Sequence, residues 1–236
     1  DPDAPRNGAS ERRSERVIVQ ATAEGTKRRL KPDQKTPVAE RVDELRSLAK
    51  KETYVARDST WAWFKELGER RDQEALDEVF ALGKAPKGLD GQTDGILVVS
   101  LIQGVLDRGL GLLSKAYLPW KGKRFDAASN RGDNLLTGFA RYPAKLIWPR
   151  YETEAVPGGR AAFDFETRIE PGKHDPDTRV LVIDYAPVEG NPDHLIRSIR
   201  DELVEVAGGA HLGKILHRTG EDTYSNLGFF ALRPAA

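Results

Sequence analysis

Short strand-like runs follow one another through the second half of the chain, and they constrain its fold more than any other feature. In the clearest run Phe163, Phe165 and Ile169 share one face, whereas Asp164 and Glu170 share the other. Such alternation is typical of an antiparallel strand with one buried face. The runs cover residues 96–102, 121–126, 135–141, 144–149, 162–170, 179–186, 211–218 and 224–232. Because closure removes exposed strand edges, the series predicts a closed or nearly closed antiparallel β-barrel of about eight strands.

Helical patterns precede the strands and interrupt them once. Thr36 and Pro37 form a start signal for one helix, and a second helical region over 59–84 is divided near Gly68. A late helix is expected after the cap at residues 191–193, with an apolar face made of Leu195, Ile196, Ile199, Leu203 and Val206. The predicted class is therefore mainly β (α+β), with the N-terminal helices and the late helix packing on or capping the barrel.

The texture of the chain divides it into three parts. Residues 1–35 hold nine Lys or Arg, six Asp or Glu and no aromatic residue, so we expect a flexible polar arm. A basic arm that contacts nucleic acid or anionic lipid is the alternative. Residues 36–84 are expected to form a helical segment that packs on the barrel, and residues 85–236 to form the barrel domain itself.

Composition excludes several classes of function. Lys plus Arg equals Asp plus Glu, at 37 each, which argues against a nucleic-acid binder. The chain has no Cys, so it has no disulfide, thiolate metal site or Cys nucleophile. No apolar run is long enough for a membrane span. No motif indicates a nucleotide, a metal or another cofactor. A cytoplasmic location is slightly favoured, although the sequence leaves open a removed leader peptide, and it does not give the oligomeric state.

The densest cluster of polar and aromatic side chains begins at Leu118-Pro119-Trp120. On a regular strand Trp120 and Arg124 point to one face, whereas Lys121 and Lys123 point to the other, solvent-exposed face. Arg124 could then hold a carboxylate or carbonyl group of a ligand while Trp120 covers an apolar body. The alternative is that Trp120 seals the end of the barrel and Arg124 pairs with Asp126, Asp133 or Asp184.

Three further polar residues are candidates for an acid or a base. Asp184 and Tyr185 end an apolar strand, and alternation places one of them on the inward face, where a buried Asp would need a cation such as Arg124 or Arg131. His211 could face the interior of the barrel. These three residues, Asp184, Tyr185 and His211, are the predicted catalytic candidates.

A set of segments resembles a known group of proteins. The set comprises Leu-Pro-Trp-Lys-Gly-Lys-Arg-Phe-Asp, Leu-Val-Ile-Asp-Tyr, Asn-Pro-Asp-His-Leu-Ile-Arg-Ser-Ile-Arg-Asp-Glu-Leu-Val-Glu-Val, His-Leu-Gly-Lys-Ile-Leu and Leu-Gly-Phe-Phe-Ala-Leu. It is similar to a poorly characterised bacterial family with a lipocalin-like (calycin-type) β-barrel, over about residues 85–233. The resemblance implies a barrel with an apolar cavity, and it brings no assigned reaction.

Three functions remain open from the sequence. The first is binding of a small apolar or amphipathic molecule in the barrel, with a lining of Trp120, Arg124, Tyr142, Trp148, Tyr185 and Phe230. The second is a cofactor-independent cyclase, isomerase or hydratase that acts on a lipid, terpene or polyketide. The third is a protein-interaction module that uses an exposed apolar patch on residues 59–83. The partner expected from the first is a small hydrophobic molecule.

Overall fold

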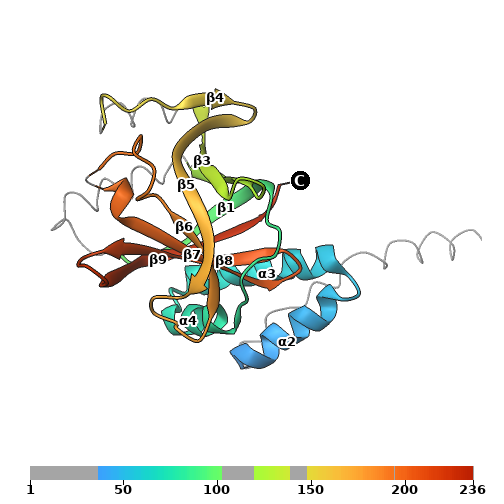
Figure 1. Cartoon of the computed structure of the whole chain (residues 1–236). Coiled ribbons are helices and arrows are strands. Elements are labelled where there is room, and N and C mark those ends of the chain that lie inside the picture. The colour runs from blue at the N-terminus through green and yellow to red at the C-terminus, as the bar shows by residue number, and fades with distance from the viewer. Residues whose placement is uncertain (1–36, 103–119, 139–147, 194, 236) are drawn as a thin grey trace, which may run out of the picture. The chain divides into compact units, whose positions relative to one another are not determined.

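The computed structural model describes residues 37–102, 120–138, 148–193 and 195–235. Its strands lie in the antiparallel order β3-β2-β1-β9-β8-β7-β6-β5-β4, and β3 also pairs with β5 (Figure 1). The second pairing closes eight strands into a barrel and leaves β4 as an extra strand on β5. The strands are β1 (Gly91–Ser100), β2 (Trp120–Asp126), β3 (Arg131–Leu136), β4 (Glu154–Val156), β5 (Gly159–Pro171), β6 (Arg179–Asp184), β7 (Ile199–Ala207), β8 (Ala210–Arg218) and β9 (Tyr224–Pro234).

The closed antiparallel barrel confirms the predicted fold class, with differences in individual strands. β3 begins four residues before the predicted run 135–141. β4, which has three residues, was not predicted. Of the predicted strand 144–149, residues 148 and 149 are not in a strand, and the remainder lies outside the described residues. The predicted arm, residues 1–35, also lies outside them.

In the described part of the chain, three helices precede the barrel and pack on the outer face of β1, β7, β8 and β9. They are α2 (Val38–Ala49), α3 (Thr53–Glu69) and α4 (Gln73–Leu82). Asp72 caps α4 by accepting a hydrogen bond from the Ala75 N–H. Gly68 lies inside α3, and a Cβ atom at this position would stand 2.2 Å from the Val98 carbonyl oxygen. Its absent side chain lets α3 approach β1 closely, whereas the sequence suggested that Gly68 separates two helices.

The prediction of a late helix was wrong. A short 3-10 turn, η2 (Ile196–Ser198), is followed at once by β7. The spacing of apolar residues fits a helix, but β7 is buried on both faces, so it lacks the polar face that marks a surface strand. Arg200, Asp201 and Glu202 each form an ion pair, which lets a strand of this composition lie inside the protein.

The two faces of the barrel wall build two separate cores. The outer core lies between the helices and the wall, and includes Phe64, Leu76, Phe80, Val204 and Phe229. The inner core lies on the inner face of the wall, and includes Phe125, Phe165, Ile183, Tyr185, Leu203, Ile215 and Phe230. Residues of the two cores alternate along the strands: in β7, for example, Leu203 belongs to the inner core and the next residue, Val204, to the outer core. None of the helices in the described ranges is long and apolar enough to cross a membrane.

Candidate functional site

A bulge in β2 determines which of its side chains enter the barrel. The register of β2 against β3 shifts between Trp120 and Gly122. A Cβ atom on Gly122 would lie 2.0 Å from the Thr93 carbonyl oxygen, so only glycine fits this close approach to β1. The shift turns Trp120 and Lys123 to the same, inward face. The prediction that Lys123 faces solvent is therefore wrong, because regular alternation fails at the bulge.

Lys123 is the centre of a buried polar cluster inside the barrel. We call Lys123, Asn134, Tyr185 and Asp201 the inner cluster. The Lys123 Nζ donates to Asn134 Oδ1 at 2.9 Å, to the Tyr185 hydroxyl at 2.5 Å and to Asp201 Oδ2 at 2.9 Å. Tyr185 in turn donates to Asp201 Oδ2 at 2.9 Å. The inner cluster thus joins four strands or strand ends, from β2, β3, β6 and β7.

Asn134 fixes the orientation of its neighbours. Its Nδ2 donates to the Phe163 carbonyl and to the Tyr185 hydroxyl, both at 3.2 Å. Its Oδ1 also accepts a hydrogen bond from the Trp120 indole N–H at 3.1 Å. Trp120 is held in this way at the edge of the cluster, where its ring packs edge-on against Phe230 at 5.8 Å between centroids.

Aromatic rings surround the Lys123 ammonium group. The Nζ atom lies 5.2–5.7 Å from four ring centroids, those of Trp120, Phe165, Tyr185 and Phe230. The side chains of Lys123 and Asp201 are each only 1% exposed. Burial lowers the pKa of Lys123, against the opposing effect of the nearby Asp201 carboxylate. A cation is therefore held in an apolar interior by one carboxylate, two neutral acceptors and four rings.

Two features of the interior, as far as the described residues show it, would allow a further contact: a carboxylate oxygen without a hydrogen bond and an exposed apolar side chain. Asp201 Oδ1 is buried and accepts no hydrogen bond, although buried carboxylate oxygens normally have a partner. Leu97 pairs with Phe230 across β1 and β9 and so shares its inward face, yet it is 42% exposed. The inner face of the wall is therefore accessible at Leu97, beside Phe230. The Phe230 ring in turn lies 5.3 Å from Lys123 Nζ.

The predicted lining residues do not all lie together. Trp120, Tyr185 and Phe230 lie together at the inner cluster. Arg124 lies on the outside of the barrel, where it forms a bidentate pair with Asp133 at 2.9 and 2.6 Å, as the alternative interpretation proposed. Tyr142 lies outside the described residues.

Arg124 lines a pocket of about 540 Å³ on the outer surface, which is mostly acidic. Within this pocket burial raises the pKa of Asp164, and the charges of Asp133 and Glu154 raise it further. The expected inward position of Arg124 was wrong, because residues beyond the bulge at Gly122 occupy the opposite faces from those that regular alternation assigns.

Trp148 packs edge-on against Phe163 at 5.3 Å and lines a second pocket, of about 530 Å³, with residues 149–152, 190, 192 and 193. Tyr151 stacks on the same Phe163 ring at 5.1 Å. Its hydroxyl accepts a hydrogen bond from the Phe163 N–H, and burial raises the pKa of Tyr151 to about 12. Trp148 therefore lies beside the inner core rather than at the inner cluster.

The three catalytic candidates do not converge. Tyr185 belongs to the inner cluster. Asp184 points to the outer face, where Arg168 donates to its Oδ2 at 2.8 Å, so its cation is neither Arg124 nor Arg131. His211 is buried on β8, where burial lowers its pKa to about 4, and its Nδ1 has no partner among the described residues. The titratable groups that do contact Tyr185 include Lys123 and Asp201.

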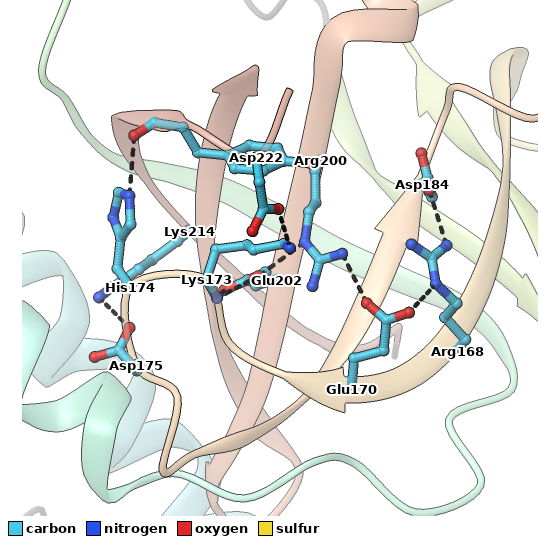
Figure 2. A network of polar contacts seen from close by, with 11 residues as sticks. Arg168, Glu170, Lys173, His174, Asp175, Asp184, Arg200, Glu202, Lys214 and Asp222 are labelled. Atoms are coloured by element: carbon cyan, nitrogen blue, oxygen red, sulfur yellow. Dashed lines mark hydrogen bonds and ion pairs between the residues drawn. The ribbon is translucent and has the colours of Figure 1, made fainter. Parts of the chain in front are cut away.

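A second polar assembly lies on the outer face of the barrel (Figure 2), and we call it the outer network. Arg200 pairs with Glu202 and Glu170, each at 2.8 Å, and Glu170 also pairs with Arg168 at 2.5 Å. Arg200 and Glu202 alternate with Asp201 along β7, so the same strand supplies charges to both sides of the wall. Glu202 is fully buried.

The outer network also attaches loops to the wall. Glu202 accepts a hydrogen bond from the Lys173 N–H at 3.0 Å, and Lys173 pairs with Asp222. Lys214, which is buried, pairs with Asp175 of the β5–β6 loop and with Asp77 of α4, each at 2.7 Å. Each of these contacts joins one protein segment to another, so the outer network has a structural role.

Sequence reasoning missed Lys123, Asn134 and Asp201. Gly122 was a signal for the position of Lys123. An isolated glycine in a strand suggests a bulge, and a bulge reverses the faces of the residues that follow it. Asp201 was hidden by the helix assignment, and Asn134 fell just before the predicted strand 135–141, whereas the structure has it in β3. No group of His, Asp or Glu in the described part of the chain is arranged to hold a metal ion.

Comparisons with known proteins add little to this geometry. No protein family and no curated protein matches the chain. The crystal structure of a protein from Thermomonospora curvata is similar over 70% of this chain and 85% of that chain, with 15% identity and a TM-score of 0.39.

Proposed function

We propose that the barrel binds a small amphipathic molecule in its interior, with the polar end of the molecule at the inner cluster. Asp201 Oδ1, which has no hydrogen-bond partner among the described residues, carries this proposal. A buried carboxylate oxygen without a hydrogen bond costs about 1–3 kcal/mol or more, and a ligand that donates to it would remove that cost. The ligand is thus expected to carry a hydroxyl or N–H group.

The surroundings of the inner cluster support an apolar body for this ligand. Trp120, Phe165 and Phe230 form an aromatic wall around the polar groups. Leu97 extends that wall to an accessible part of the inner face. Ligand sites commonly combine such an apolar lining with a few fixed polar groups. The arrangement suits one ring system or short chain that ends in a hydrogen-bond donor.

The alternative of an interaction surface on residues 59–83 has less support. Trp61 and Trp63 are buried, at 6% and 8% exposure, and pack in the outer core with Phe64 and Phe80. The large apolar residues that are exposed in the described part of the chain are Tyr54, Leu97 and Ile169, and none of them lies in that segment.

Isothermal titration calorimetry with two matched probes tests the proposal. 2-Naphthol has a hydroxyl donor on an apolar body, whereas 2-methoxynaphthalene has the same body without the donor. We expect 2-naphthol to bind at least about tenfold more tightly, since a hydrogen bond to a charged group contributes about 1.5–3 kcal/mol. The outer-face variant Asp133→Asn should keep this difference. Equal affinities, or no binding of either probe, would contradict the proposal.

A further inference from the structure

The chemistry around Lys123 extends beyond hydrogen bonding. A buried amine among aromatic rings, beside a carboxylate and a hydroxyl, has the groups needed to form an imine with an aldehyde or ketone. We propose that Lys123 captures carbonyl compounds covalently, as a protonated imine held against Asp201. This inference rests on the proposed function, because the carbonyl compound must first occupy the interior of the barrel.

The inner cluster supplies each proton that the reaction needs. Asp201 Oδ2, 2.9 Å from Lys123 Nζ, takes a proton from the ammonium group and leaves a neutral amine. The amine attacks the carbonyl carbon, and one N–H proton moves to the carbonyl oxygen to give a carbinolamine. Tyr185, hydrogen-bonded to both groups, lies where it can relay protons to that oxygen.

Loss of water completes the balance of atoms and charge. Asp201 returns its proton to the carbinolamine hydroxyl, the C–O bond breaks, and water leaves as the C=N bond forms. An ammonium–carboxylate pair and a carbonyl compound thus give an iminium–carboxylate pair and water. Because the reactant ammonium and the product iminium both carry one positive charge at Nζ, Asp201 and the four rings that hold the ammonium also hold the product.

The chain contains a matched buried lysine outside the barrel. Lys214 is 2% exposed, pairs with Asp77 and Asp175, and lies 4.5 Å from the centre of the Phe80 ring. It therefore resembles Lys123 in burial, charge partner and aromatic neighbour. It differs in facing the outer network, where the proposed ligand does not bind. Lys121, which is exposed and two residues before Lys123 in the chain, serves as the accessible control.

Reductive trapping with 2-naphthaldehyde and sodium cyanoborohydride, followed by peptide mapping of the full-length chain, tests the inference. We expect the secondary-amine adduct on Lys123 to exceed that on Lys121 or Lys214 at least about tenfold, because binding holds the aldehyde beside one amine. The Lys123→Arg variant, which keeps the cation, should lose this adduct.

An unmodified Lys123 would overturn the inference, whether or not surface lysines react. The two proposals then remain distinguishable. If 2-naphthol binds but 2-naphthaldehyde leaves Lys123 unmodified, covalent capture is wrong and ligand binding stands. If 2-naphthol does not bind, the proposed function itself is wrong, and with it the inference that depends on it.

Discussion

Removing either partner of the buried pair formed by Lys123 and Asp201 should lower the free energy of unfolding by an unusually large amount. Both side chains are 1% exposed, and the ammonium has three hydrogen-bond acceptors. Removing one partner leaves the other charge buried, which costs about 3–5 kcal/mol. We therefore expect Lys123→Met and Asp201→Leu each to lower the free energy of unfolding by about that amount.

The double variant separates the interaction from the two substitutions. Without either charge no ion is left unpaired, so the double variant should be more stable than the sum of the single effects predicts, by about 2–3 kcal/mol. Urea unfolding followed by tryptophan fluorescence gives each free energy, with similar m-values as the check on comparable transitions. The exposed pair Arg131–Glu166, at 68% and 38% exposure, is the control and should contribute about 0–1 kcal/mol. A cost below about 1 kcal/mol for Lys123→Met would refute the reasoning, because the pair would then behave like one at the surface.

Three other substitutions test the geometry around the site. Gly122→Ala places its Cβ 2.0 Å from a backbone oxygen and should cost about 3 kcal/mol or more in urea unfolding, whereas Gly190→Ala, with open space around it, should cost less than about 1 kcal/mol. The pKa of His211 is lowered to about 4, so the unfolded chain takes up its proton first as the pH falls. The contribution of neutral His211 to stability is therefore complete above about pH 6.5 and should decline by on the order of 3 kcal/mol towards pH 4. The difference in unfolding free energy between the unaltered chain and His211→Gln, followed across that pH window, measures this decline. A difference that stays constant with pH would contradict the assignment. Tyr151→Phe removes the acceptor for the Phe163 N–H and should cost about 1–3 kcal/mol in the same unfolding assay, and an unchanged midpoint would show that this hydrogen bond is unimportant.

Simple alternation was enough to predict most of the barrel, because most strands have one clearly apolar face. The run from Phe163 to Ile169 lies in β5, and the apolar strand before Asp184 is β6. Alternation also placed Tyr185 and Asp184 on opposite faces, which the structure confirms. β7 defeated the same reasoning, since both of its faces are buried and its charges are paired within the protein.

The candidate site was predicted in part, and the errors have one local cause. Trp120, Tyr185 and Phe230 were chosen as lining residues and lie together around Lys123. The bulge exchanges the faces of β2 beyond Gly122, so Lys123 enters the barrel and Arg124 leaves it. A one-residue shift of register moves every later side chain to the other face, and only the three-dimensional contact with Thr93 reveals that the shift occurs.

Methyl NMR during a titration with 2-naphthol tests most directly whether ligands bind inside the barrel. Leu203 and Ile215 belong to the inner core, whereas Val204 and Leu212, on the same two strands, belong to the outer core. Binding at the inner cluster predicts saturable shifts of the Leu203 and Ile215 methyl signals, with little change at Val204 and Leu212. Shifts confined to the outer pair, or no shift at any of the four, would contradict an interior binding site.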